Sequence, residues 1–246
     1  MKKSLVERAT EQLIDGIVMD EYPGDVLPAQ EILCKQFGIS RSVLREAVSA
    51  LSKRGILHIL PKIGMRVTPV CNWKMIDGDV INWRLLTRRS NGGFSRDLAE
   101  FRMWIEPKAA AQAALHASMK DRISIWSAYN LLLRAGDREA YMAADIALHS
   151  AIMMSSSNQL LQQMVEVVRA ERLAAHLSGQ VSMARSGAEL ETLARLMEAI
   201  DTRDATGATA TMVELLGFDE QIEEQLDPAP AEGSLSQSTR PPRRKT

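Results

Sequence analysis

The feature that most constrains this chain is a 16-residue amphipathic segment, Ser40 to Gly55, with the sequence SRSVLREAVSALSKRG. At about 100° per residue, one side of such a helix is apolar and the other carries Arg and Ser. Ser40 is a favourable N-cap and Gly55 a favourable residue just past the C-terminus, so the segment has its own start and stop signals. A shorter helix is predicted over residues 28–37, and Gly38-Ile39 leaves room only for a tight turn. The pattern predicts a helix-turn-helix.

Two short apolar runs follow, residues 56–60 and 65–68, separated by turn residues that include Gly64. They predict a two-stranded β-wing. Between residues 40 and 66, six basic residues against one acidic residue give a net charge of +5, whereas the whole chain carries −1. Such local positive charge is typical of a polyanion-binding surface, because phosphate neutralisation supplies much of the binding free energy. Periodicity alone leaves open an amphipathic core helix with a solvated charged face.

Residues 28–67, PAQEILCKQFGISRSVLREAVSALSKRGILHILPKIGMRV, closely resemble the winged helix-turn-helix of the GntR family of bacterial transcription regulators. The match includes the SR-x3-REA core and the wing glycine. The resemblance implies double-stranded operator DNA as the partner, with Arg41 and Arg45 reaching guanine edges or phosphates in the major groove and the wing tip in the minor groove. The DNA-binding residues expected on this basis are Ser40, Arg41, Ser42, Arg45, Lys62, Gly64 and Arg66.

The chain departs from this pattern at the start of the preceding helix. Many relatives carry Arg there, just after an acidic residue, whereas this chain has Gln30-Glu31. We therefore expect no phosphate contact at Glu31.

The second half of the chain is predicted to be helical. From Phe94 to about Leu226, Ala, Leu, Met, Glu and Arg dominate and β-branched runs are scarce, which indicates an all-α bundle. Breaks are expected near Gly136, at residues 155–158, near Gly187 and at Gly207. The fold class is therefore mainly α, with an N-terminal winged helix-turn-helix, a small β-wing and a C-terminal helical bundle.

The expected organisation has four parts. These are a DNA-binding domain over residues 1–69, a linker packing between the domains over 70–93, an effector-binding and dimerisation domain over 94–226, and a disordered tail over 227–246. The tail is rich in Pro, Ser and Gly. No signal peptide or membrane-spanning window is evident, so we expect a cytoplasmic protein. The two cysteines, Cys34 and Cys71, have no metal or redox spacing and are interpreted as incidental thiols.

The helical half resembles the ligand-sensing FCD domain of the FadR branch of the GntR family. The matching stretches are FRMWIEPKAAAQAA (101–114), ADIALHSAIMMSSSNQLL (144–161) and EAIDTRD (198–204). In relatives with a metal, one Asp and three His hold a divalent ion, and an Arg of the first bundle helix helps to bind an anionic ligand. The resemblance assigns the first two metal ligands to Asp145 and His149, and the arginine to Arg102.

The other two ligand positions fall on Leu193 and Leu215, whose hydrocarbon side chains donate no lone pair. A divalent metal such as zinc or manganese would keep only two ligands, so we expect no cofactor. Without a metal, Arg102 would bind a carboxylate, and Asp145 and His149 would hydrogen-bond hydroxyls. The alternative from the residues alone is that Arg102 and Glu106, four residues apart, simply pair on their helix surface.

The linker contains the pattern W-x3-D-x-DV-x2-W from Trp73 to Trp83. A similar segment occurs in the branch of GntR members that resemble the galactonate-operon repressor, which implies a sugar acid as the effector. We expect a homodimeric repressor of a sugar-acid operon that a small organic acid releases from its operator. Another carboxylate effector, fatty-acyl or lactate-type, and a DNA-binding protein with no effector are the alternatives. No GxSxG, HExxH or phosphate-binding loop supports an enzyme.

Overall fold

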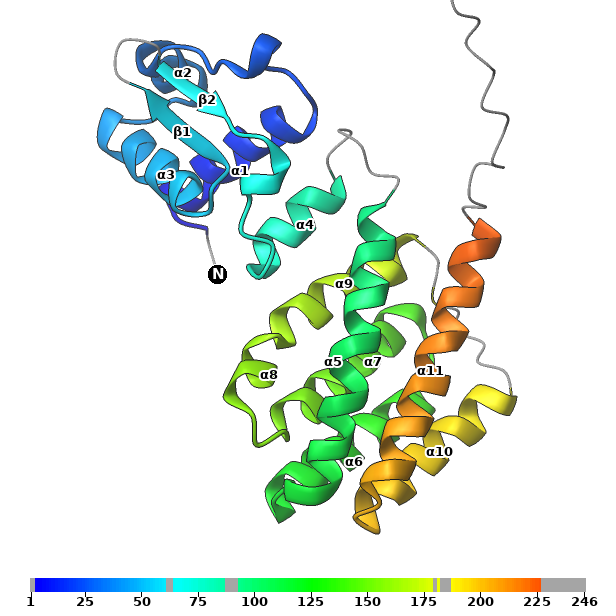
Figure 1. The fold of residues 1–246 in the computed structure, drawn as a ribbon. Helices are drawn as coiled ribbons and strands as arrows, with labels where there is room; N and C mark the ends of the chain where they lie inside the picture. The colour runs from blue at the N-terminus through cyan, green and yellow to red at the C-terminus, as the bar shows by residue number, and fades with distance from the viewer. Residues whose placement is uncertain (1–2, 61–63, 87–92, 179–180, 182–186, 227–246) are drawn as a thin grey trace, which may run out of the picture.

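The computed structural model describes residues 3–60, 64–86, 93–178, 181 and 187–226. Among these residues the fold is mostly helical, with one two-stranded antiparallel sheet near the N-terminus and a helical bundle after it (Figure 1). The mainly α fold class predicted from the sequence is confirmed. Lys62 and the tail from residue 227 lie outside the described residues.

The N-terminal half is a winged helix-turn-helix. Its elements are α1 (Leu5–Val18), a 3-10 turn (Pro23–Asp25), α2 (Gln30–Phe37), α3 (Arg41–Lys53), β1 (Leu57–Leu60) and β2 (Gly64–Val67). The Ser40 hydroxyl accepts a hydrogen bond from the Val43 N–H at 3.3 Å, so the predicted N-cap starts α3. The strands pair antiparallel, with Leu57 opposite Val67.

The periodicity of α3 sets which side of the helix is buried. Leu44, Val48 and Leu51 are at most 1% exposed and share one hydrophobic cluster with residues of α1, α2 and the sheet. The arginines on the other side of α3 face solvent. Packing therefore orients the helix and leaves its basic side exposed.

A short helix, α4 (Gly78–Leu86), lies between the two halves, after a 3-10 turn (Val70–Asn72) (Figure 1). Its consecutive residues Val80 and Ile81 are both fully buried. Val80 belongs to the winged cluster, whereas Ile81 packs in a separate cluster with Val167 and Ala170 of the bundle. The linker therefore contacts both halves through a helix.

The bundle is built from α5 (Phe94–His116), α6 (Met119–Arg134), α7 (Arg138–Met154), α8 (Gln159–Gln163), α9 (Val165–Ser178), α10 (Gly187–Asp201) and α11 (Ala205–Leu226). Helix α5 packs on α11, and α7 packs on α6 and α9. Within the described residues, no helix is both long and apolar enough to cross a bilayer.

The predicted break at Gly207 is wrong. The chain breaks before that residue, because α11 begins at Ala205 and includes Gly207 in its first turn. The Asp204 carboxylate accepts a hydrogen bond from the Gly207 N–H at 2.9 Å, as a side chain at a helix start does. The preceding residue, Arg203, has a φ of 64°. The cap at Asp204, and not the glycine, sets the boundary.

Gly55, between α3 and β1, lies against the backbone of Asn72. Its φ is +77°, and a Cβ there would lie 2.1 Å from the Asn72 carbonyl oxygen. Gly38, after α2, has a φ of +64° with open space around it. We expect Gly38→Ala to lower the unfolding free energy by about 1 kcal/mol, from left-handed strain alone. Gly55→Ala adds a backbone clash and should cost at least about 2 kcal/mol.

Urea unfolding of the full chain, followed by circular dichroism, measures both variants. Equal costs for the two substitutions would contradict the close approach of Asn72 to Gly55.

Candidate functional site

The first candidate surface is the N-terminal end of α3. Arg41, Ser42 and Arg45 are all exposed, and the Arg41 side chain keeps 70% of its surface. The Ser40 and Ser42 hydroxyls are hydrogen-bonded to each other at 2.8 Å. These four residues therefore lie together at one exposed helix end, next to the turn from α2.

The wing carries the other described residues expected to contact DNA. Gly64 and Arg66 lie on β2 and are exposed. The Arg66 guanidinium donates to the Gly24 carbonyl at 3.3 Å, which ties the wing to the loop after α1. Gly64 has a φ of +104° at the start of the strand, a conformation that L side chains rarely adopt.

The second candidate site is a cluster of charged and histidine side chains inside the bundle, which we call the buried charge cluster. Helices α5, α7 and α9 contribute to it. Its members are Arg102, Glu106, Asp145, His149, Glu171, Arg172 and His176. All are at most 2% exposed except Glu171, whose side chain is 13% exposed. The three effector residues expected from the sequence are therefore together in the interior.

One part of the cluster is centred on Glu106. Its two carboxylate oxygens bind different partners, the Arg102 Nε and the His149 Nδ1, each at 2.5 Å. Arg102 also lies 2.8 Å from Glu171, through its Nη1. The surface pair that the residues alone suggested for Arg102 and Glu106 does form, but in the interior, where it bridges α5 to both α7 and α9.

The other part is centred on Asp145. One of its oxygens accepts hydrogen bonds from Arg172, at 2.7 Å from Nε and 2.5 Å from Nη2. The same oxygen lies 2.9 Å from the His176 Nε2. Its second oxygen is 3.9 Å from the His149 Nε2, which links the two parts. Asp145 thus joins α7 to α9 through a buried ion pair.

The electrostatics of Glu106 reflect this packing. Burial alone raises the pKa of its carboxyl group, but interactions with Arg102 and His149 outweigh burial and lower the pKa from 4.5 to about 2. The carboxylate is therefore ionised at neutral pH and holds the two cationic or donor groups in place.

Sequence reasoning missed the role of α9. The local sequence pattern singles out neither Arg172 nor His176, because a charged residue in a helix usually faces solvent. The spacing of Arg172 and His176 nevertheless indicates which side of α9 they lie on. Arg172 and His176 follow the buried Val168 at four-residue steps, so all three lie on one side of the helix. That side faces the core.

The donor set does not fit the divalent metal that the family resemblance implies. Leu193 and Leu215 are 0% and 3% exposed within the main apolar core. The guanidinium of Arg172 already lies against the Asp145 carboxylate, where it would repel a cation. Among the described residues, no group of three or more His, Cys, Asp or Glu could hold a metal ion. The Arg172 guanidinium therefore pairs with one of the two remaining side chains that could bind a metal.

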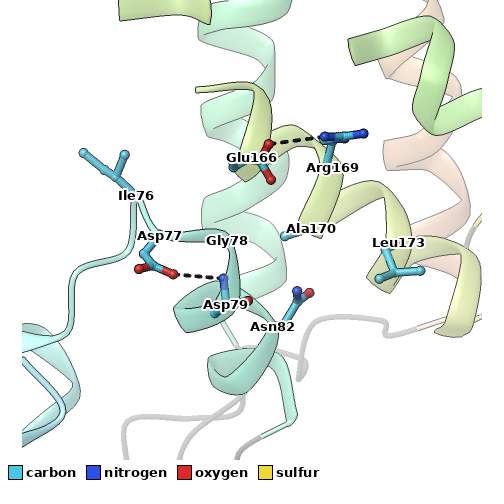
Figure 2. Close-up of a pocket in the computed structure, with 9 residues that line it drawn as sticks. All are labelled: Ile76, Asp77, Gly78, Asp79, Asn82, Glu166, Arg169, Ala170 and Leu173. Carbon is cyan, nitrogen blue, oxygen red and sulfur yellow. Dashed lines mark hydrogen bonds and ion pairs between the residues drawn. The ribbon is translucent and has the colours of Figure 1, made fainter. Parts of the chain in front are cut away.

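A groove of about 400 Å³ separates α4 from α9 (Figure 2). Its lining residues are Ile76, Asp77, Gly78, Asp79, Asn82, Glu166, Arg169, Ala170 and Leu173. On the winged side, Arg54 at the end of α3 donates to Asp77 at 2.8 Å and to Asp79 at 3.2 Å. Gly78 lies so close to Glu166 that a Cβ would be 3.2 Å from its carbonyl oxygen. Helix α4 thus contacts both the end of α3 and α9.

Two family models match this chain. Residues 4–67 match the model described as bacterial regulatory proteins, gntR family, and residues 97–218 match the FCD domain. Together they include the exposed end of α3, the wing and all members of the buried charge cluster.

Individual relatives agree with the family models. The chain is 35% identical over 150 residues to the galactonate operon transcriptional repressor of Escherichia coli K12, covering 60% of this chain and 65% of that protein. It is 32% identical over 164 residues to the uncharacterised HTH-type regulator YieP of the same organism, covering 65% and 71%. The solved structure of Lar, which controls the expression of the Listeria monocytogenes agr system, has a TM-score of 0.59 at 20% identity. That match covers 92% of this chain and 100% of Lar, and shows a shared fold.

The charge cluster predicts a pH-dependent effect of Glu106→Gln. Because the folded pKa of about 2 lies below the ordinary 4.5, the carboxylate stabilises the fold above pH 4.5, and this contribution is lost as the pH falls towards 2. We expect Glu106→Gln to cost about 3 kcal/mol at pH 7, since two buried partners lose their counter-charge. The cost should shrink between pH 4.5 and 2.

Urea unfolding at a series of pH values measures this difference, with Glu214→Gln as the matched control. Glu214 pairs with Arg195 at 2.6 Å, but on the surface, so its loss should matter far less. A cost at Glu106 that does not change with pH would contradict the ionised state described above.

Proposed function

Because the chain belongs to the GntR family of bacterial regulatory proteins, we propose that it is a homodimeric repressor of a sugar-acid catabolic operon. It is a DNA-binding transcriptional regulator and not an enzyme. In the proposed division, residues 1–69 read DNA, residues 70–93 connect the halves, and residues 94–226 bind the effector and dimerise. A small organic acid releases the protein from its operator.

The proposed DNA contacts are the exposed residues at the start of α3 and on the wing. Arg41 and Arg45 are four residues apart, so both project from the same side of a helix whose opposite side is buried. An arginine fork can bind the two acceptors of guanine at once. In a two-fold dimer, two such helices would read the half-sites of a short palindrome.

The observation that carries the effector proposal is the buried Arg102, which already binds two carboxylates, those of Glu106 and Glu171. The site is therefore complementary to a carboxylate in the bundle interior. Glu171 is the more exposed of the two carboxylates, so it is the one that an effector carboxylate would replace. Asp145 and His149 would then accept from or donate to the hydroxyl groups of a sugar acid.

This exchange would reach the DNA-reading half through α9. Glu171 lies on α9, which also provides Glu166 and Ala170 to the groove against α4. Asp79 of α4 in turn pairs with Arg54 at the end of α3. An effector that binds one placement of α9 more tightly than another would shift the recognition helices and weaken DNA binding.

Similarity to the galactonate operon repressor supports an aldonate as the effector. A lactate-type or fatty-acyl carboxylate is the alternative. Leu193 and Leu215, which stand at the other two ligand positions that the family resemblance implies and are buried, favour a less polar ligand of this kind. The other alternative is a DNA-binding protein with no effector. A change in DNA affinity with an added acid separates these cases.

The DNA-reading role predicts the behaviour of Arg45→Ala. Because Arg45 is exposed on α3, its loss should leave folding intact and cost about 1 to 3 kcal/mol in operator binding. Fluorescence anisotropy on operator DNA measures the loss, with Arg195→Ala on the bundle surface as the control. Unchanged affinity and selectivity of Arg45→Ala would contradict the assignment of α3.

The effector role predicts a separate effect of Arg102. We expect Arg102→Ala to keep operator binding but to abolish release by the acid. Since removing this charge leaves two buried carboxylates, Arg102→Lys is the companion variant: it keeps the charge but loses the bidentate fork, and should weaken release at least about tenfold. Anisotropy titrations with the acid measure both. Wild-type release in both variants would exclude Arg102 from the effector site.

A further inference from the structure

An acidic residue lies at the exposed end of the recognition helix. Glu31, in the first turn of α2, and Arg41, the first residue of α3, are ten positions apart, and the tight turn after Gly38 brings them together. The Arg41 Nη2 donates to the Glu31 Oε1 at 2.6 Å. Both side chains are 70% exposed. A carboxylate therefore contacts one of the two α3 arginines proposed to read DNA.

A contribution to folding stability does not explain why Glu31 and Arg41 form this ion pair. An ion pair between two side chains that are this exposed contributes little, because water and salt screen it. Binding to DNA does not account for the carboxylate either, since a negative charge at a surface facing phosphates weakens non-specific binding. The pair therefore reduces the general attraction of α3 for DNA without stabilising the fold appreciably.

The chemistry of Arg41 indicates what the pair does. An exposed arginine next to DNA can bind a phosphate oxygen or the N7 and O6 acceptors of guanine. Glu31 affects these two choices differently. Its negative charge repels a phosphate near Arg41, whereas the guanine acceptors are neutral and still accept from the N–H groups that Glu31 leaves available. It also restricts the rotamers of Arg41 before binding.

We propose that Glu31 is a specificity-determining residue that directs Arg41 to a guanine of the operator half-site and away from the phosphate backbone. This rests on the proposed DNA-reading role of α3. The relevant partner is double-stranded DNA with a G·C pair opposite Arg41. Glu31 contributes selectivity at that base pair and lowers affinity for DNA in general.

The test uses the full chain and operator DNA selected from a random-sequence library by the wild-type protein. Anisotropy gives the affinity of wild type and Glu31→Gln for this DNA and for every single base-pair substitution in the half-site, at several salt concentrations. Glu31→Gln keeps the size of the side chain and removes its charge. Glu214→Gln is the matched control, because it removes the charge of an equally short, exposed ion pair in the bundle.

We expect Glu31→Gln to lose about tenfold of the discrimination at one G·C position and to bind non-specific DNA several-fold more tightly. Its affinity should also fall more steeply with salt, by about one further phosphate contact. Glu214→Gln should match wild type. In an Arg41→Ala background, where the G·C discrimination is already lost, Glu31→Gln should cause no further loss.

Discrimination by Glu31→Gln within twofold of wild type at every position would overturn the proposal. The proposal would also be overturned if adding Glu31→Gln to Arg41→Ala reduced discrimination as much as Glu31→Gln does in the wild-type chain, because Glu31 would then act independently of Arg41. Selective binding by wild type in these cases would leave the proposed function standing. Absence of selective binding by wild type would overturn the proposed function, and this inference with it.

Discussion

The bundle depends on charges that pair inside it. Burying a carboxylate or a guanidinium is costly unless each finds a partner. Here Glu106 pairs with Arg102 of its own helix and His149 of α7, and Asp145 pairs with Arg172 of α9. These bonds join α5, α7 and α9 at defined positions. Apolar contacts alone would fix the relative positions of the three helices less strictly. If one helix moved alone, its ion pairs would break and leave buried charges unpaired, so movements of the three helices are coupled. The cluster is therefore both a structural constraint and the place where a charged ligand would have its largest effect.

Helix α9 connects the buried charge cluster to α4 and, through α4, to the winged half. One side carries Arg172 and His176 into the cluster, and the other side lines the groove against α4 (Figure 2). Because α4 has buried residues in the winged cluster and in a bundle cluster, it is the element through which the proposed shift of α9 would reach the winged half. The ion pair from Arg54 to Asp77 places the end of α3 directly on this route. The proposed regulation therefore requires no contact between effector and DNA-reading residues.

The sequence predicts the local features well and the long-range ones poorly. The start of α3 follows from the cap at Ser40, its buried side from apolar spacing and the wing from its turn residues, all of which are local signals. The break expected at Gly207 is wrong because the Asp204 cap three residues earlier starts the helix. The four-residue spacing after Val168 could place Arg172 on the core side of α9, but only the packing of α9 against α7 brings it to Asp145. The sequence already shows leucines at two of the expected metal-ligand positions, and both are buried. The position of the Arg172 guanidinium beside Asp145 follows only from the three-dimensional fold.

The central claim is that a sugar acid bound in the bundle through its carboxylate changes how α3 binds DNA. Its most direct test is the affinity of the wild-type chain for its operator, measured by anisotropy at two salt concentrations with and without each of a panel of sugar acids. We predict selective, salt-sensitive binding that one acid weakens at least about tenfold at both salt concentrations. Selective binding that no acid in the panel alters would contradict the claim of a sugar-acid effector.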